Sequence, residues 1–239
     1  MSGATWSSSN GFDARGVYTF DGDDEIDLGD AFDLDEVTVL LWINGDGFSG
    51  DNSFIGKSGS FAFKSSGDEL RITWPGVIDQ TSSGASLSAD TWTHVAFSYD
   101  RTAGSDQLKF YVDGVNFDNN TYSTAFTQNS NNVLIGNNQW NQYFEGELDD
   151  ILVFNRSLTS AQIYQIYLNR TDLMLHDETS EGEVWQACVT PNDVSDDGIE
   201  RCSDNLTIVT SAVDVTINAP VNSSTIADTT PLLNVTVSS

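Results

Sequence analysis

Short runs of Thr, Val, Ile, Phe, Tyr and Trp recur along this chain of 239 residues, and clusters of Gly, Asn, Asp and Ser separate them. Runs of strand-forming residues bounded by turn-forming residues are typical of an all-β sandwich. Convincing helical spacing occurs near residues 159–168, where Ile163, Ile166 and Tyr167 would share one face. No apolar run approaches the ~20 residues that span a bilayer, so we expect no membrane insertion. The sequence therefore predicts an all-β fold with one short helix.

The segment 144–167 allows the most specific structural prediction in the chain. A Gly-containing turn leads into a strand in which Asp149, Ile151 and Val153 alternate, so these three side chains are expected to share a face. A carboxylate on an apolar face is unfavourable unless a cation or several hydrogen-bond donors meet it. Asp149 is therefore predicted to have a partner.

Four segments resemble, in kind and in order, the laminin-G-like domains, which are jelly rolls of the concanavalin type related to the pentraxins. The segments are GVYTFDGDDEIDLG (16–29), DEVTVLLWING (35–45), DTWTHVAFSYDRTAGSDQLKFYVDGV (90–115) and FEGELDDILVFNRSLTSAQIYQIY (144–167). The resemblance implies a concanavalin/laminin-G-like jelly-roll sandwich over residues 1–170, closed by the short helix.

The organisation changes after the helix. Residues 171–211 resemble the terminal strands of an immunoglobulin-like module found in microbial surface proteins, and residues 212–239 resemble the opening strands of such a module. A complete sandwich of this type needs about seven strands. The two pieces are either parts of a longer array or a small Ig-like β segment that closes on itself.

Cys188 and Cys202 are the two cysteines, and they flank a turn-rich loop between strand-like runs. This arrangement predicts a cross-strand disulfide formed in an oxidising, extracellular setting. A zinc site would need more thiols or neighbouring histidines.

The charge balance is strongly acidic. Thirty-six Asp and Glu residues face nine Lys and Arg residues, which gives a formal net charge of −27. Such a surface repels nucleic acid and anionic lipid, so neither is an expected partner. We interpret the shortage of lysine as adaptation to high salt, as in halophilic proteins. The alternative is an ordinary acidic secreted domain that offsets its charge with calcium.

The resemblance also implies a structural calcium ion. In laminin-G-like domains an Asp of the F-D-G segment and an Asp of the final strand commonly help to hold this ion, and Asp21 and Asp149 stand at the matching positions. Asp23 and Asp150 are weaker candidates. A site with oxygen ligands alone suits Ca²⁺ better than zinc. The alternative is that Asp149 is buried and capped by backbone N–H groups.

Several aromatic residues stand where the sequence offers no reason for burial. Trp140 and Tyr143 lie in a loop with Asn138 and Gln139, and Trp74 precedes a Pro-Gly turn. An exposed ring can stack on the C–H face of a sugar while amides bond its hydroxyl groups. These five residues are the predicted glycan-binding site, and the alternative is that the rings pack at the rim of the sandwich.

The sequence argues against catalysis. Glycosidases of the concanavalin type carry E-x-D-x-x-E on one strand, with the outer carboxylates roughly 5.5 Å apart. The nearest match begins at Glu147, but Leu152 stands at its last position. His94 lies in an apolar run and is expected to be a core residue rather than a base. A glycoside hydrolase is therefore a remote alternative.

Together these features predict a calcium-stabilised, extracellular recognition or adhesion module of a cell-surface protein, not an enzyme. Its expected partners are glycans or surface proteins of another cell. The competing prediction is a structural spacer or protein–protein adhesion module that binds no glycan.

Overall fold

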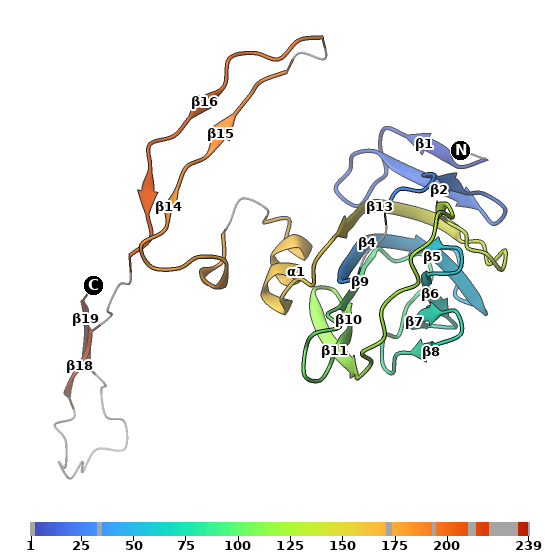
Figure 1. Ribbon diagram of the computed structural model, residues 1–239, viewed down its shortest axis with the longest axis horizontal. Coiled ribbons are helices and arrows are strands. Elements are labelled where there is room, and N and C mark those ends of the chain that lie inside the picture. Colours follow the sequence, from blue (N-terminus) through green and yellow to red (C-terminus); the bar gives the residue numbers. More distant parts are fainter. Residues whose placement is uncertain are drawn as a thin grey trace. The chain divides into compact units, whose positions relative to one another are not determined.

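The computed structural model describes residues 3–32, 35–170, 174–192, 195–209, 214–219 and 234–238 (Figure 1). The chain divides into two units, residues 1–173 and 174–239. Neither α1 nor η1, the helices within the described residues, is long and apolar enough to cross a membrane.

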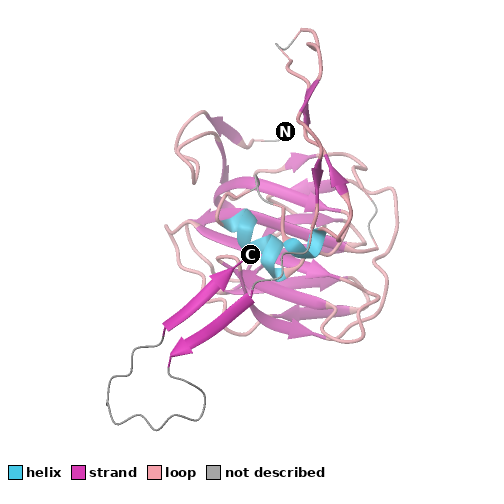
Figure 2. Cartoon of the chain, turned by 90° about the vertical axis from the view of Figure 1, so that its left-hand side faces the viewer, coloured by secondary structure: helices cyan, strands magenta, loops and turns pink. Residues whose placement is uncertain are grey.

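The first unit is a sandwich of two antiparallel sheets (Figures 1 and 2). The seven-stranded sheet has the order β1-β2-β13-β4-β9-β10-β11. These strands are β1 (Thr5–Ser7), β2 (Val17–Asp21), β13 (Glu145–Phe154), β4 (Val37–Gly45), β9 (Thr93–Tyr99), β10 (Leu108–Val112) and β11 (Val115–Asn120). The six-stranded sheet has the order β3-β12-β5-β6-β7-β8. These strands are β3 (Ile26–Asp27), β12 (Val133–Ile135), β5 (Asp51–Lys57), β6 (Phe61–Ser66), β7 (Glu69–Trp74) and β8 (Ile78–Thr81). The predicted all-β jelly-roll sandwich is confirmed.

Aromatic side chains join the two sheets. Phe63 of β6 packs edge-on against Phe54 of β5 and against Phe97 of β9, with ring centroids 5.4 and 5.0 Å apart. Phe144, just before β13, lies 5.7 Å from Phe54. Each of these rings is fully buried. Edge-to-face pairs add ~0.5–1.5 kcal/mol each beyond the burial of apolar area, so this cluster fixes the distance between the layers.

The helix α1 (Ser160–Tyr167) covers the outer face of the seven-stranded sheet, as Figure 2 shows. Thr159 and Gln162 form a capping box, because each side chain bonds the other residue's backbone N–H. Ile163 and Leu158 pack against a second small core. The sheet contributes Leu40, Ala96 and Tyr111 to that core. The helix expected near residues 159–168 is confirmed.

A bulge in β13 changes which face its side chains occupy. The pairing with β4 shifts between Asp149 and Leu152, and Asp150 has a positive φ of 46°. Leu148 belongs to the main core, and Ile151 packs against the same core. Asp149 therefore points to the outer face, since neighbouring strand residues alternate. The prediction that Asp149 shares a face with Ile151 and Val153 is wrong, because one extra residue lies between them.

The second unit consists of short two-stranded ladders within the described residues. β14 (Val184–Trp185) pairs with β17 (Leu206–Thr207), and β15 (Cys188–Val189) pairs with β16 (Arg201–Cys202). β18 (Asp214–Ala219) pairs with β19 (Asn234–Ser238). The sequence LMLHDET (173–179) predicts a strand, but the described part of that segment contains the 3₁₀ helix η1 (His176–Glu178). Residues 171–173 and most of 210–233 lie outside the described residues, so the Ig-like assignment stays a prediction.

Cys188 and Cys202 lie opposite each other in the β15–β16 ladder and form a disulfide. The predicted bridge is confirmed. The apolar side chains of this ribbon, including Val184, Val189 and Leu206, are exposed. A two-stranded ribbon is marginally stable by itself, so the bridge is its main covalent constraint.

Reduction of the disulfide should loosen residues 184–209 and leave the sandwich folded. A closed loop of ~15 residues contributes ~3 kcal/mol on the chain-entropy model, and both cysteines lie outside the first unit. Hydrogen exchange with and without reductant measures this by segment, and a variant with both cysteines replaced by serine is the control. Equal protection of residues 184–209 in both conditions would contradict the expectation.

Candidate functional site

The loop of residues 136–144, between β12 and β13, covers the outer face of the six-stranded sheet. Its backbone is tied to the sheet at both ends, because Gly136 N–H donates to Phe54 O at 2.9 Å and Ser53 N–H donates to Gln142 O at 3.0 Å. Ser53 Oγ also donates to Asn137 O at 3.1 Å. The loop is therefore a fixed part of the sandwich surface.

A buried ion pair lies beneath this loop. Lys64 of β6 is 3% exposed, and its Nζ donates to Asp51 Oδ2 and to Gln142 Oε1, both at 2.8 Å. Gln142 Nε2 donates to Asp51 Oδ2 at 2.9 Å, and Asn138 Nδ2 donates to Gln142 Oε1 at 2.9 Å. Arg71 of β7 approaches Asp51 at 3.4 Å. We call Asp51, Lys64, Arg71, Asn138 and Gln142 the Asp51 network.

The network holds Asp51 in its ionised form. Burial acts to raise the pKa of Asp51, but hydrogen bonds from Lys64 and Ser66 and the charges of Lys64 and Arg71 outweigh it. The pKa of Asp51 is therefore lowered. A buried ammonium needs such a partner, because removing one member of a buried pair leaves an uncompensated charge.

Trp140 is exposed but fixed in place. Its backbone N–H donates to Asn138 Oδ1 at 2.9 Å. Lys64 Nζ lies 5.2 Å from the centroid of its ring, which is cation–π distance. The residue is nevertheless 43% exposed. The predicted exposure of Trp140 is confirmed, and two members of the Asp51 network, Asn138 and Lys64, contact the residue.

An open groove of about 510 Å³ runs beside this ring. We call it the Trp140 groove, and it is lined by Thr73, Trp74, Pro75, Gly76, Val77, Ile78, Asp79, Gln139 and Trp140. Gln139 Oε1 accepts hydrogen bonds from Ser58 Oγ at 3.0 Å and from Gly59 N–H at 2.7 Å, which orients the amide. The Nε2 group of Gln139 and the carboxylate of Asp79 have no partner among the described residues. The groove thus offers an aromatic wall, an amide donor and an acceptor.

Trp74 is not an exposed platform. It is 1% exposed, stacks on Phe126 with centroids 4.2 Å apart, and meets Tyr99 edge-on at 5.2 Å. Its position on β7 follows the alternation that buries Leu70 and Ile72. The expectation that Trp74 binds sugar is therefore corrected: the residue borders the groove, but its ring belongs to the core.

The other two predicted groups have different surroundings. Asn138 is buried and acts within the Asp51 network. Tyr143 is half-buried, next to the core residue Phe144. Asn138 therefore positions the loop, whereas Gln139 and Trp140 face the groove.

The structure separates the two predicted calcium ligands. Asp21 lies opposite Glu145 in the β2–β13 ladder, whereas Asp149 is four residues further along β13, opposite Trp42. Four residues of strand span on the order of 13 Å. Asp149 Oδ2 accepts from Phe12 N–H and Asp149 Oδ1 accepts from Asp150 N–H, each at 2.9 Å. Asp149 is therefore capped by backbone donors, which is the alternative that the sequence left open.

Asp21 has two other carboxylates beside it. Carboxylate oxygens of Asp21, Asp23 and Asp24 all lie within 4.8 Å of one another. Asp24 is buried and its Oδ2 accepts from Asp21 N–H at 3.0 Å. A hydrogen bond to Asp21 and the charges of Asp21 and Asp24, together with burial, raise the pKa of Asp23. This set can hold a cation or a proton. The sequence pointed to Asp21 and Asp23 and missed Asp24.

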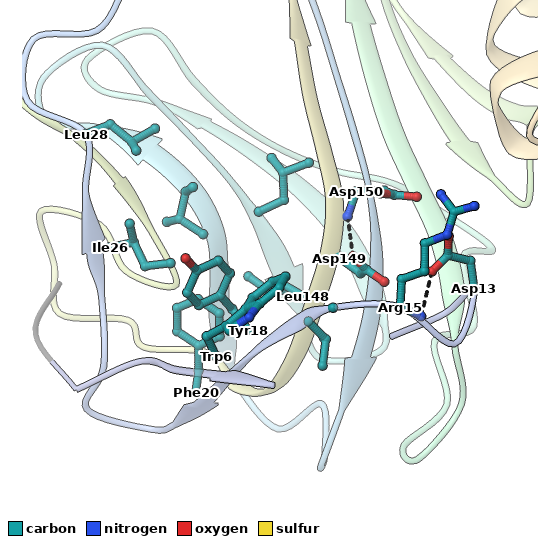
Figure 3. A pocket seen from close by; sticks show the side chains of 14 residues that line it. Trp6, Asp13, Arg15, Tyr18, Phe20, Ile26, Leu28, Leu148, Asp149 and Asp150 are labelled. Carbon is teal, nitrogen blue, oxygen red and sulfur yellow. Dashed lines mark hydrogen bonds and ion pairs between the residues drawn. The ribbon is translucent and has the colours of Figure 1, made fainter. Parts of the chain in front are cut away.

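A second hollow of about 510 Å³ opens at the edge of the sandwich (Figure 3). We call it the edge cleft. Its apolar part is lined by Trp6, Val17, Tyr18, Phe20, Ile26, Leu28, Ile135, Leu148 and Ile151, and its polar part by Asp13, Arg15, Gly16, Asp149 and Asp150. The sequence did not reveal this cleft, because its walls come from strands that are far apart in the chain.

His94 is a structural residue. It is buried, and its ring packs against Trp42 and Tyr167 with centroids 5.3 and 5.7 Å away. Both ring nitrogens lack a hydrogen-bond partner within the described residues. Burial lowers the pKa of His94 to about 4, so the ring is neutral at pH 7. The predicted core histidine is confirmed.

Neutralising Asp51 should weaken the fold and remove part of its acid sensitivity. Since the pKa of Asp51 is lowered on folding, the stability that its charge provides is complete above the ordinary carboxyl pKa of about 3.9 and is lost as pH falls through the folded-state pKa. We expect Asp51→Asn to unfold more readily at neutral pH and to lose less stability on acidification. Denaturant unfolding between about pH 7 and pH 2.5 measures both effects.

Asp79→Asn is the matched control, since Asp79 is an exposed carboxylate that lines the Trp140 groove and is not part of the Asp51 network. Its pH profile should follow that of the unaltered protein. Parallel acid profiles for Asp51→Asn and the unaltered protein would show that the Asp51 network does not stabilise the loop.

Comparisons with known proteins agree with this fold. A laminin-G-type family model, described as the Concanavalin A-like lectin/glucanases superfamily, matches residues 20–164. None of the curated proteins compared matches the chain.

Several solved structures share the fold. Domain 4 of AbnA, a GH43 extracellular arabinanase from Geobacillus stearothermophilus in complex with arabinotriose, has a TM-score of 0.57 and 18% identity, covering 70% of this chain and 82% of that one. The CBM40 of the Ruminococcus gnavus IT-sialidase, bound to alpha2,3 sialyllactose, has a TM-score of 0.55 and 12% identity, and the match covers 63% of this chain and 96% of that one. The native heptameric SAP-like pentraxin from Limulus polyphemus has a TM-score of 0.50 and 17% identity, covering 62% and 80%. At these identities the likeness establishes the fold alone.

Proposed function

The chain belongs to the Concanavalin A-like lectin/glucanases superfamily, and we propose that its sandwich is a non-catalytic carbohydrate-binding module whose site is the Trp140 groove. The observation that carries this proposal is the ring of Trp140, which is exposed yet fixed by the Asp51 network. An aromatic ring that is already ordered loses little conformational entropy when a ligand stacks on it.

The groove has the chemistry that a sugar requires. The face of Trp140 stacks on the C–H groups of a pyranose or furanose ring, and this contact is apolar. Gln139 Nε2 donates a hydrogen bond to a hydroxyl oxygen, and Asp79 accepts one from a hydroxyl group. The groove is shallow and open, which suits a chain of sugars better than a small enclosed ligand. Two structural neighbours, the arabinanase domain and the sialidase CBM40, were solved with arabinotriose and sialyllactose, which supports the class of ligand.

The carboxylates of β13 favour binding over hydrolysis. Glu147 Oε2 accepts from Asn44 Nδ2 at 3.0 Å, and Leu152 stands where the glycosidase pattern has its second outer carboxylate. Asp149 is committed to two backbone N–H groups. A retaining or inverting mechanism needs two free carboxyl groups across the scissile bond. The disulfide in the second unit supports an extracellular setting, and a role on a cell surface in high salt is part of the same proposal.

Replacing Trp140 should abolish glycan binding without unfolding the protein. Trp140→Ala removes the stacking surface, so we expect affinity for a bound oligosaccharide to fall at least about tenfold. Thermal stability should change little, because the ring is half-exposed and its cation–π contact is worth about 1 kcal/mol. A glycan array identifies the ligand, and calorimetry with that oligosaccharide measures the loss.

Trp140→Phe, which keeps an aromatic face, should retain part of the affinity, and Trp6→Ala in the edge cleft should retain all of it. If Trp140→Ala binds the array hit as tightly as the unaltered protein does, the site lies elsewhere. If no glycan binds at all, the spacer or protein-adhesion alternative gains support.

We further propose that Asp21, Asp23 and Asp24 hold a structural calcium ion. The residues present fit such an ion, because three carboxylate oxygens converge within 4.8 Å of one another. A hydrogen bond to Asp21 and the charge of Asp21 also raise the pKa of Asp23. Glu145, opposite Asp21 in the ladder, is a fourth nearby carboxylate. A cluster with oxygen ligands alone suits Ca²⁺. Bound there, the ion would join β2 to the turn that follows it.

Calcium should raise the melting temperature, and Asp23→Asn should remove most of that response. An ion that binds the native state alone adds ~2.7 kcal/mol at a concentration one hundred times its dissociation constant. Melting curves in calcium and in EDTA measure the effect at constant ionic strength. Asp149→Asn is the control: it should lower stability but keep the calcium response, because Asp149 is bonded elsewhere. An equal melting temperature in calcium and in EDTA would contradict the proposed calcium site.

A further inference from the structure

The edge cleft exists because two sheet edges lie apart. β1 is the outermost strand of the seven-stranded sheet and β3 is the outermost strand of the six-stranded sheet. One wall of the cleft comes from β1, β2 and β13, and the other from β3 and β12. Core-type side chains such as Tyr18, Leu148 and Ile151 thus reach a hollow that solvent can enter. An apolar hollow of this size on a protein surface marks a binding site.

The aromatic wall of the cleft is formed by Trp6, whose ring packs against neighbouring residues. Trp6 is 56% exposed, yet its ring lies 5.0 Å from the ring of Tyr18, centroid to centroid. The ring also lies directly on Gly16, where a Cβ atom would fall among the indole carbons. The lack of a side chain at residue 16 is therefore what allows Trp6 to lie across the cleft. A large ring held this way binds a partner at low entropic cost.

The other end of the cleft is acidic (Figure 3). Asp13 is paired with Arg15 at 3.2 Å, and Asp149 accepts two backbone hydrogen bonds. The carboxylate of Asp150 has no hydrogen bond or ion pair with any residue that the structure describes. Three carboxylates thus face one guanidinium group. Burial and the charges of Asp149 and Asp13 raise the pKa of Asp150, with Arg15 opposing them, so a cation beside this carboxylate would favour its ionised form.

We propose that the edge cleft is a docking site for an extended segment of a basic partner protein. A bulky apolar side chain of that segment enters the apolar end, against Trp6, Tyr18 and Leu28. A Lys or Arg two residues away, whose side chain points to the same side of the extended segment, pairs with Asp150. This surface is separate from the Trp140 groove and binds a different class of ligand.

The choice of occupant follows from charge and from the edge strand. The chain carries a net charge of −27, which repels acidic partners and speeds the approach of basic ones. The apolar end offers a sugar almost no hydrogen-bonding groups. β1 has no strand on its outer side among the described residues, so the side of the cleft that it borders is open to an extended segment. Side chains of such a segment point alternately toward and away from the cleft.

Two blocked pentapeptides test the proposal, Lys-Thr-Phe-Thr-Lys and Glu-Thr-Phe-Thr-Glu, with phenethylammonium as a third probe. Nuclear magnetic resonance titration of the whole chain measures binding through its tryptophan indole N–H signals. We expect the lysine peptide to bind and to shift the Trp6 signal, and the glutamate peptide to bind at least about tenfold more weakly. Phenethylammonium should bind more weakly than the lysine peptide, since it offers one ring and one ammonium group and none of the other contacts of a peptide.

The variants separate the two ends of the cleft. Trp6→Ala should lower the affinity for the lysine peptide at least about tenfold. Gly16→Ala should have the same effect, because the added Cβ atom displaces the Trp6 ring while every side chain of the cleft is kept. Asp150→Asn should reduce the difference in affinity between the two peptides. Trp140→Ala should leave the affinity for both peptides unchanged. Equal binding of both peptides overturns the charge argument. Insensitivity to both Trp6→Ala and Gly16→Ala overturns the site, and tighter binding of phenethylammonium than of the peptide overturns the protein partner.

Discussion

The register of β13, with its bulge at Asp150, is the constraint on which the proposed sites of the sandwich depend. β13 is a central strand, paired with β2 on one side and β4 on the other. Before the bulge, Leu148 enters the core and Asp149 points outward to receive the N–H of Phe12. After it, Ile151 enters the core again. Without the extra residue, Asp149 and Ile151 would lie on the same face of the strand. With Ile151 in the core, the carboxylate of Asp149 would then enter the aromatic core as well, at a large desolvation cost.

The same strand sets the positions of the other functional groups. The loop that carries Trp140 ends where β13 begins, and Glu145, its first residue, lies opposite Asp21. Leu148 and Ile151 form one wall of the edge cleft, and Asp150 lies at its acidic end. A shift of one residue in this register would therefore move the proposed sugar, calcium and docking sites together.

Much of the fold could be predicted from local signals, whereas the sites depended on register. The capping box at Thr159, the alternating strand patterns and the two cysteines are readable over a few residues, and the structure has the helix, the sandwich and the bridge. The burial of Trp74 was also readable, since Leu70 and Ile72 alternate with it on β7. The separation of Asp21 from Asp149 could not be predicted in this way, because it depends on which residues of β13 pair with β2. The ion pair of Lys64 with Asp51 joins strands whose pairing no single segment encodes, and the edge cleft depends on where two sheet edges end.

The distribution of cations explains why the three proposed sites differ in their chemistry. Lys57 and Lys64 are both buried, each against a carboxylate, at Asp30 and Asp51. Their charge therefore does little to offset the acidic residues that solvent meets. Around Trp140 the buried ammonium of Lys64 balances Asp51, so the groove is suited to a neutral sugar. At Asp23 and at Asp150 no lysine among the described residues makes such an ion pair. A hydrogen bond to Asp21 and the charge of Asp21 raise the pKa of Asp23, and burial and the charges of Asp149 and Asp13 raise the pKa of Asp150. A protein with this charge pattern gains most from partners that bring positive charge, a divalent ion at the first position and a basic side chain at the second.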